Sequence, residues 1–352
     1  MKVRVYLIWS FLVASLMMSA QDYHFSQFYA APLTLNPALT GNFNGLYRIS
    51  GIYRFQWPGL TTSGPAFSTP SIGVDFSLFR QKLKNSAFGV GVMFLNDQQN
   101  GKTFNTNYIL GSVAYNMMFG AHKEFQLGVG IQGGVIMTKA DIGSLHFDEG
   151  YDKNFNYTAA NAGESLAGAK TKGQINAGIF AKYEFKPGMR VYAGYALSNA
   201  TQYKQDYLLN SSTYNTPIRH TLHGGFEFDM SDKMVFIPGF MFQHTHVDNA
   251  ETDFGLTVGF HVVKSPDPAK RTTFFVGLWN RINTGNYTLI PKVGLEWKNF
   301  RAGIAYDAAL AKQRADGSNI GAPYAQAFEL TLAFIGDIKV LKEDHYLFNP
   351  RY

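Results

Sequence analysis

Apolar and polar residues alternate with a period of two from about residue 46 to residue 335. Successive side chains of a strand point to opposite faces, so this period is typical of strands whose two faces meet different surroundings. In one segment large apolar residues occupy every second position: Phe254, Leu256, Val258, Phe260 and Val262. Helical periodicity is hard to find. The sequence therefore predicts an all-β protein.

The alternating segments number about fourteen, and the connections between them differ in length. Their centres fall near residues 51, 74, 91, 111, 130, 179, 193, 224, 239, 258, 276, 292, 303 and 331. If the first strand rises from the periplasm, the tight turns 186–188, 230–232 and 298–299 all lie on the periplasmic side, and the long connections 138–173, 199–217 and 308–325 lie outside. An even strand number and this asymmetry of loops are features of outer-membrane barrels.

Composition separates this barrel from other classes of protein. Charged residues make up 16% of the chain and aromatic residues 15%, whereas a soluble β-sandwich, the alternative fold, should carry more surface charge. Beyond the N-terminus the longest apolar or glycine run covers residues 87–95, too short for a spanning helix. We therefore predict an antiparallel transmembrane β-barrel of the outer membrane with about 14 strands, flanked by N- and C-terminal periplasmic or lumenal segments.

The ends of the sequence suggest four regions. Lys2 and Arg4 precede an apolar stretch that ends in small residues, which predicts a signal peptide over residues 1–20 and export through the inner membrane of a Gram-negative cell. Residues 21–44 form an N-terminal segment that serves as a plug or for docking. The barrel covers residues 45–335, and a C-terminal periplasmic tail covers 336–352.

Residues with catalytic or metal-binding chemistry are not arranged in any recognisable site. The sequence has no Cys, which excludes disulfides, thiolate zinc sites and cysteine nucleophiles. His244, His246 and Asp248 lie at a predicted loop rim, where solvated side chains are the better interpretation. Inward positions carry charges of both signs, which suits ion pairs or a bound peptide better than a selective ion pore. We expect no enzyme, no cofactor, no metal and no nucleic-acid partner.

Three short motifs resemble the PorP/SprF family of outer-membrane proteins associated with type IX secretion in Bacteroidota. The phrase FSQFYAAPLTLNPALTG resembles the family's opening, with nine matching positions: Phe25, Ser26, Gln27, Tyr29, Pro32, Asn36, Pro37, Ala38 and Gly41. The phrase YRFQWPGL is similar to its next block and places Arg54, Trp57 and Gly59. Family members often end in Cys-Pro-Arg-aromatic; here Asn349 replaces the Cys, and Pro350, Arg351 and Tyr352 follow.

This resemblance implies a noncatalytic barrel of the type IX secretion and gliding machinery. Such a barrel would help to export or anchor a secreted cell-surface protein, an adhesin, that bears a C-terminal sorting domain. The implied partners are that protein, periplasmic or lipoprotein components of the machinery, and outer-membrane lipid. The competing interpretation is a porin-like diffusion or nutrient channel, because wide barrels usually conduct and alternation does not distinguish a filled lumen from an open one.

Overall fold

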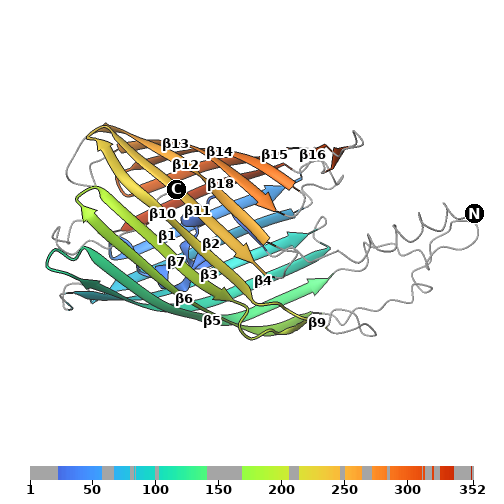
Figure 1. Cartoon of the computed structure of the whole chain (residues 1–352). Coiled ribbons are helices and arrows are strands. Elements are labelled where there is room, and N and C mark those ends of the chain that lie inside the picture. The colour runs from blue at the N-terminus through green and yellow to red at the C-terminus, as the bar shows by residue number, and fades with distance from the viewer. Residues whose placement is uncertain are drawn as a thin grey trace, which may run out of the picture.

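The computed structural model shows a single closed β-barrel (Figure 1). It describes residues 23–57, 67–79, 83, 85–99, 103–140, 169–205, 214–245, 250–263, 272–283, 286–310, 312–313, 319–320, 326–336 and 350. No helix in these ranges is long and apolar enough to cross a membrane.

Fourteen antiparallel strands form the wall, as the alternation predicts. They are β1 (Tyr47–Gln56), β2 (Phe67–Leu78), β3 (Ser86–Gln99), β4 (Phe104–Phe119), β5 (Phe125–Ala140), β6 (Lys170–Lys186), β7 (Met189–Ser198), β10 (Arg219–Ser231), β11 (Met234–His244), β12 (Ala250–Val263), β13 (Thr272–Asn283), β14 (Asn286–Trp297), β15 (Phe300–Leu310) and β18 (Ala327–Gly336). Each pairs with its neighbour in the chain, and β1 pairs with β18 from Tyr47↔Gly336 to Gln56↔Ala327 to close the barrel.

The two ends of the barrel differ in their connections. One end, called here the tight-turn end, carries the turns 187–188, 232–233 and 298–299. The opposite, long-loop end carries the connections after β5, β7 and β15, which contain the short hairpins β8 (Lys204–Gln205) with β9 (Tyr214–Asn215) and β16 (Lys312–Gln313) with β17 (Asn319–Ile320). The asymmetry has exceptions: the short connection 284–285 lies at the long-loop end, and 264–271 at the tight-turn end.

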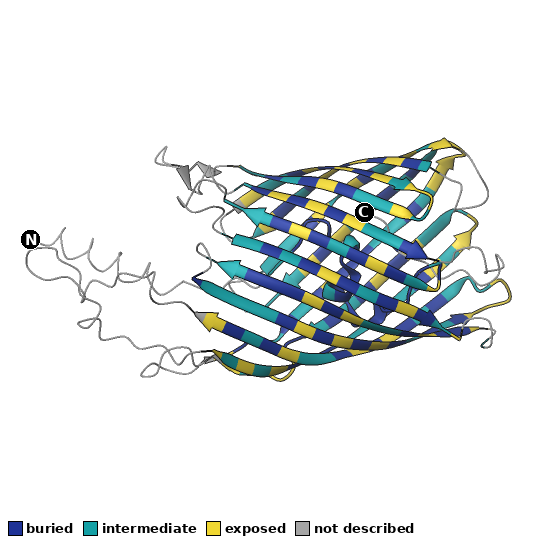
Figure 2. Ribbon diagram, turned by 180° about the vertical axis from the view of Figure 1, so that it is seen from behind, coloured by how far each residue is buried: buried dark blue, intermediate teal, exposed yellow. Residues whose placement is uncertain are grey.

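Exposure alternates along the strands, so the wall has an apolar outer face (Figure 2). On β5, Ile131 is 60% exposed while the next residue, Gln132, is 4% exposed; on β18, Leu332 and Thr331 show the same contrast at 58% and 4%. A strand in lipid must pair both edges because the bilayer core offers no water to unpaired backbone groups. The apolar outer belt and the closed ladder meet both requirements of a membrane-spanning wall.

Residues 23–44, called here the lumenal segment, run through the inside of the barrel as a compact coil (Figure 2). The coil has three short helical turns, η2 (Phe28–Ala30), α2 (Pro32–Leu35) and η3 (Pro37–Leu39). Pro32 and Pro37 each begin a turn, where a fixed φ favours the helix and the missing N–H costs nothing. The Asn36 side chain accepts from the N–H of Ala38 and so caps η3.

Candidate functional site

The lumenal segment contacts the inner wall at three places, named here the Ser26, Asn36 and Gly41 anchors. The wall residues of the Ser26 anchor lie toward the long-loop ends of their strands, whereas Arg48 and Asp75 of the Gly41 anchor lie toward the tight-turn end. The segment therefore runs along the lumen from the long-loop side toward the tight-turn end, where it continues into β1.

At the Ser26 anchor the wall binds the backbone of two residues. The two oxygens of the Glu329 carboxylate accept from the N–H groups of Ser26, at 2.6 Å, and Gln27, at 2.8 Å. The Lys292 ammonium donates to the carbonyl of Ser26 and lies 4.0 Å from the ring centroid of Trp279. Charge-assisted hydrogen bonds of this kind are roughly twice as strong as neutral ones. The wall thus holds a peptide backbone on both its donor and its acceptor side.

The Ser26 hydroxyl joins the segment to a buried network of ion pairs. It donates to Asp307 at 2.7 Å and accepts from Arg54 and Arg281, each at 3.0 Å. Arg54 also pairs with Asp307 at 2.8 Å and with Glu329 at 2.6 Å, and all these side chains are at most 4% exposed. Because an unpaired charge at such burial is costly, the network depends on every partner being present.

Most ion pairs of the network lie within the wall itself. Arg281 makes two further bonds, at 2.8 and 2.9 Å, to Asp253, and its guanidinium lies 3.3 Å from the carboxylate of Glu251. Arg54 and Arg281 thereby pair with four carboxylates: Glu251, Asp253, Asp307 and Glu329. These ion-pair contacts join wall residues to each other without the lumenal segment, so the wall holds its own charges in the positions that receive Ser26 and Gln27.

At the Asn36 anchor one amide holds both the segment and the wall. Its oxygen accepts from Ala38 N–H at 2.9 Å, so its nitrogen is the group that donates to the carbonyl of Ile179 at 2.9 Å and meets Nε2 of His223 at 3.0 Å. The imidazole Nε2 must therefore accept, and Nδ1 carries the proton that is donated to the Tyr29 hydroxyl at 3.1 Å. Burial raises the pKa of Tyr29 well above its ordinary value, so this hydroxyl stays neutral.

Asn36 can be tested with two substitutions that remove different bonds. Asn36→Asp keeps the cap on Ala38 but loses the donors to Ile179 and His223, and Asn36→Ala loses all of these bonds. We expect Asn36→Ala to lower the free energy of unfolding by about 2 kcal/mol and Asn36→Asp to lower it too, since each leaves buried groups unpaired. Equilibrium unfolding in detergent measures both. Wild-type stability in both variants would show that the anchor is dispensable.

The Gly41 anchor lies where the segment turns toward β1. Asp75 accepts from the N–H of Gly41 at 2.7 Å and from Arg48 at 2.7 and 3.0 Å, while Arg48 also donates to the carbonyl of Leu39 at 3.1 Å. Gly41 has a φ of +67°, a left-handed conformation that other residues rarely adopt. This explains why glycine stands five residues after Asn36 in the motif.

Glycines of the wall allow the segment to approach the strand backbones closely. A Cβ at Gly130 would lie 2.5 Å from the carbonyl carbon of Pro37, one at Gly178 would overlap the Asn36 amide oxygen, and one at Gly89 would overlap the Thr40 carbonyl. These glycines belong to three different strands, β5, β6 and β3. Any side chain there must displace either the segment or the wall.

Apolar side chains of the wall also pack against the segment. The Phe28 ring meets Trp279 edge-on with centroids 5.5 Å apart, in a buried cluster that includes Leu39, Phe180 and Met241. The simple expectation that inward positions are polar or glycine is therefore incomplete. Inward apolar residues are present because they cover the apolar side of the lumenal segment instead of lining water.

The start of the segment lies beneath the long-loop end. The Tyr23 ring meets Tyr108 edge-on at 5.1 Å, and Arg219 lies 5.0 Å over the ring and donates to the Tyr23 carbonyl at 3.2 Å. Tyr203, just before hairpin β8–β9, packs like Tyr23 against a second buried apolar cluster, which includes Phe25, Leu33 and Tyr108. The connection after β7 thus lies against the first described residues of the chain.

The structure gathers most of the motif residues but not all of them. Phe25, Ser26, Gln27, Tyr29, Pro32, Asn36, Pro37, Ala38 and Gly41 lie in the lumenal segment, and Arg54 binds Ser26. Trp57, in contrast, follows β1 at the long-loop end, where its ring packs against Phe67 with the ring centroids 5.0 Å apart. Pro350 lies in a lumenal pocket described below. Gly59, Arg351 and Tyr352 are outside the described residues.

Several residues of the anchors were not singled out by motif. The alternation along β13 and β18 predicts that the side chains of Arg281 and Glu329 face the lumen. Only closure of the barrel brings these side chains to Ser26. His220 and His223 lie on opposite faces of the wall: His223 is buried inside, and His220 bonds Tyr195 on the outer face at 2.6 Å. Among the described residues no three His, Cys, Asp or Glu side chains are placed to bind a metal, and His246 and Asp248 fall outside those residues.

Solved structures with a similar fold are outer-membrane transport barrels. The toluene transporter TbuX of Ralstonia pickettii is 11% identical, with a TM-score of 0.47 over 87% of this chain and 94% of that one. A FadL homologue of Pseudomonas aeruginosa is also 11% identical, with a TM-score of 0.50 over 85% and 92%. At these identities the likeness concerns the fold alone. Among curated proteins, none matches the sequence.

The family comparison covers nearly the whole chain. The model of the family described as type IX secretion system membrane protein PorP/SprF matches residues 17–334, which include the lumenal segment and all fourteen strands of the wall except the last two residues of β18. The chain therefore belongs to the PorP/SprF family of type IX secretion system membrane proteins.

Proposed function

We propose that this barrel is a noncatalytic component of the type IX secretion and gliding machinery that helps to export or anchor a secreted adhesin with a C-terminal sorting domain. It works with periplasmic or lipoprotein components of that machinery. The observation that carries the proposal is the lumenal segment, which lies inside the barrel of a PorP/SprF-family chain and contains the residues that resemble the family's opening motif. A barrel that holds an internal segment in place with these residues is suited to binding partners at its two ends.

Contacts within the lumen favour this role over diffusion of small solutes. Three anchors and a buried apolar cluster hold the segment, and Ala38, Thr40 and Asn42 each have 0% exposed surface. The paired charges of the Ser26 anchor bind one another and the segment instead of attracting ions. An open nutrient channel needs a free path, so we propose that the segment closes the lumen.

The cargo side of the proposal rests on the long-loop end. Long connections there are rich in aromatic residues, a type that buries much area at low entropy cost in interfaces. The residues are Tyr151, Phe155, Tyr157, Tyr203, Tyr207 and Tyr214. The connections 138–173 and 199–217 would contact the secreted protein, while the tight-turn end and the C-terminal residues would face periplasmic partners.

Affinity purification from native outer membrane tests the partner assignment. We expect a tagged wild-type chain to copurify a secreted protein with a type IX sorting domain, identified by mass spectrometry. A variant with Tyr151, Phe155 and Tyr157 changed to Ser should recover less of it at an equal amount of folded barrel. A tagged unrelated barrel is the control. Recovery of no such secreted protein by the wild type would refute the proposal.

Planar-bilayer recording separates the proposal from the diffusion channel. The wild-type protein should give no steady current if the segment closes the lumen as proposed. Large steady currents from folded wild-type protein would instead support a porin-like channel. This measurement needs no partner, so its outcome is independent of the purification.

A further inference from the structure

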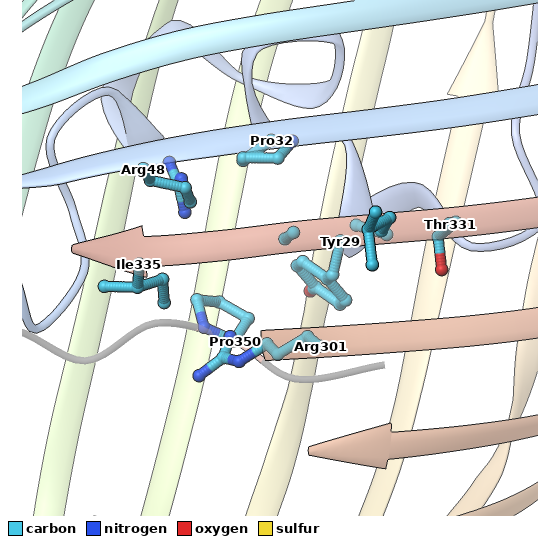
Figure 3. A pocket seen from close by; sticks show the side chains of 10 residues that line it. Tyr29, Pro32, Arg48, Arg301, Thr331, Ile335 and Pro350 are labelled. Carbon is cyan, nitrogen blue, oxygen red and sulfur yellow. The ribbon is translucent and has the colours of Figure 1, made fainter. Parts of the chain in front are cut away.

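A pocket in the lumen lies between the lumenal segment and the strands β1, β15 and β18, where the barrel closes (Figure 3). Its wall side comes from Arg48 on β1, Arg301 on β15 and Thr331, Ala333 and Ile335 on β18. Its other side is the lumenal segment, through Tyr29, Ala30 and Pro32. Arg301 and Ile335 lie near the turn 298–299, so the pocket lies toward the tight-turn end of the lumen.

A residue from the far end of the chain completes this pocket. Pro350 is buried and lines it beside Arg301 and Ile335 (Figure 3). Pro350 thus shares the pocket with apolar side chains of the segment, Tyr29 and Pro32, and with Ile335 of the wall. We propose that the pocket is a docking site for residues 349–352 of the same chain, which hold the lumenal segment in its seat.

Tether length favours an occupant from the same chain. Ile335 and Pro350 line one pocket, and the fourteen residues 336–349 between them extend to at most about 50 Å, ample for leaving the barrel and returning to its mouth. A tether of such length gives an effective concentration of the order of millimolar. Even a weak pocket for one proline and its neighbours is therefore filled, whereas a free peptide of equal affinity competes poorly.

Docking couples the two ends of the chain. Ala30 and Pro32 form part of the pocket only while the segment is seated, so residues 349–352 bind the seated segment better than the displaced one. By linkage, a periplasmic protein that captures residues 349–352 weakens the seat of the segment by the same factor. The pocket thus gives the tight-turn end a means to act on the lumen.

Crosslinking tests the docking directly, because the natural chain has no Cys. Pro350→Cys is combined in the full-length chain with Ala333→Cys, with Ala30→Cys, or with Ala302→Cys as the control. Ala302 follows Arg301 on β15 but pairs with Leu332 on the outer face of the wall. With a short bis-maleimide and mass spectrometry of the linked peptides, the first two pairs should link and the control should not. Absence of both links, or equal linking of the control, would overturn the proposal.

A second measurement follows the segment itself. A single Ala30→Cys is labelled with a maleimide in the full chain and in a chain lacking residues 349–352. We expect several-fold faster labelling in the shortened chain, while an exposed reporter at Ser231→Cys reacts equally in both. Equal rates at position 30 would show that residues 349–352 do not hold the segment. Neither measurement involves cargo, so failure here leaves the proposed secretion role to its own tests.

Discussion

Arg54→Ala is expected to lower the free energy of unfolding by about 3–5 kcal/mol, the range found when one partner of a buried ion pair is removed. Arg54 contacts Asp307, Glu329 and the Ser26 hydroxyl, so its loss leaves two carboxylates underneutralised at 3% exposure or less. Glu329 also binds the backbone N–H groups of Ser26 and Gln27, and Asp307 accepts from the Ser26 hydroxyl. The same change should therefore loosen the start of the lumenal segment.

Equilibrium urea unfolding in detergent gives the size of this effect. Arg54→Lys keeps the positive charge but lacks the planar guanidinium that binds both carboxylates at once. Its free energy of unfolding should therefore fall between those of the wild type and of Arg54→Ala. The control is Arg301→Ala, which removes an ion pair of similar length, 2.9 Å to Glu296, but with side chains 21% and 15% exposed. Partly exposed pairs of this kind contribute about 1 kcal/mol or less. If Arg54→Ala and Arg301→Ala lowered the free energy of unfolding equally, the stabilising role of the network at Ser26 would be refuted.

Gly130→Val is expected to open the lumen. Already the Cβ of the new side chain would lie 2.5–2.6 Å from backbone atoms of Pro37 and Ala38, and its methyl groups reach further. The strand is held by continuous backbone ladders to β4 and β6, whereas the segment is held by its three anchors and by apolar packing without such a ladder, so the segment moves. Overpacking of this size costs about 1–3 kcal/mol, and we expect steady currents in planar bilayers where the wild type is silent.

Gly173→Val is the matched control for this experiment. Gly173 lies on the neighbouring strand β6, and a Cβ there meets nothing within 4 Å. The variant should remain silent and as stable as wild type. If Gly130→Val folds and is equally silent, the segment is not what closes the lumen. If both variants conduct, the current has another origin.

Alternation, turn residues and loop lengths predict the barrel well. The centres of all fourteen predicted segments fall within strands of the wall, since a period of two in side-chain direction is a local property of each strand. Residues such as Arg48, Arg54 and Asp75 are also inside, as their parity predicts. Parity does not tell which inward residues meet, because that depends on strand tilt and on the order in which the sheet closes.

The motif residues illustrate the difference. Phe25 to Gly41 can be singled out in the sequence as a family phrase, yet nothing local says what Ser26 or Asn36 contacts. Ser26 binds Glu329 and Asp307, about 300 residues away in the chain, because β18 closes on β1. Asn36 finds His223, which becomes a partner only when β10 presents it to the lumen.

Local period and short motifs, both visible in the amino-acid sequence, predict the number of strands, the face on which their side chains lie and the family of the chain. The folded barrel alone shows that residues 23–44 lie in the lumen, that wall glycines make room for them and that Pro350 and Pro32 line one pocket. Those contacts join residues distant in sequence, and their geometry arises from closure of the barrel around the segment.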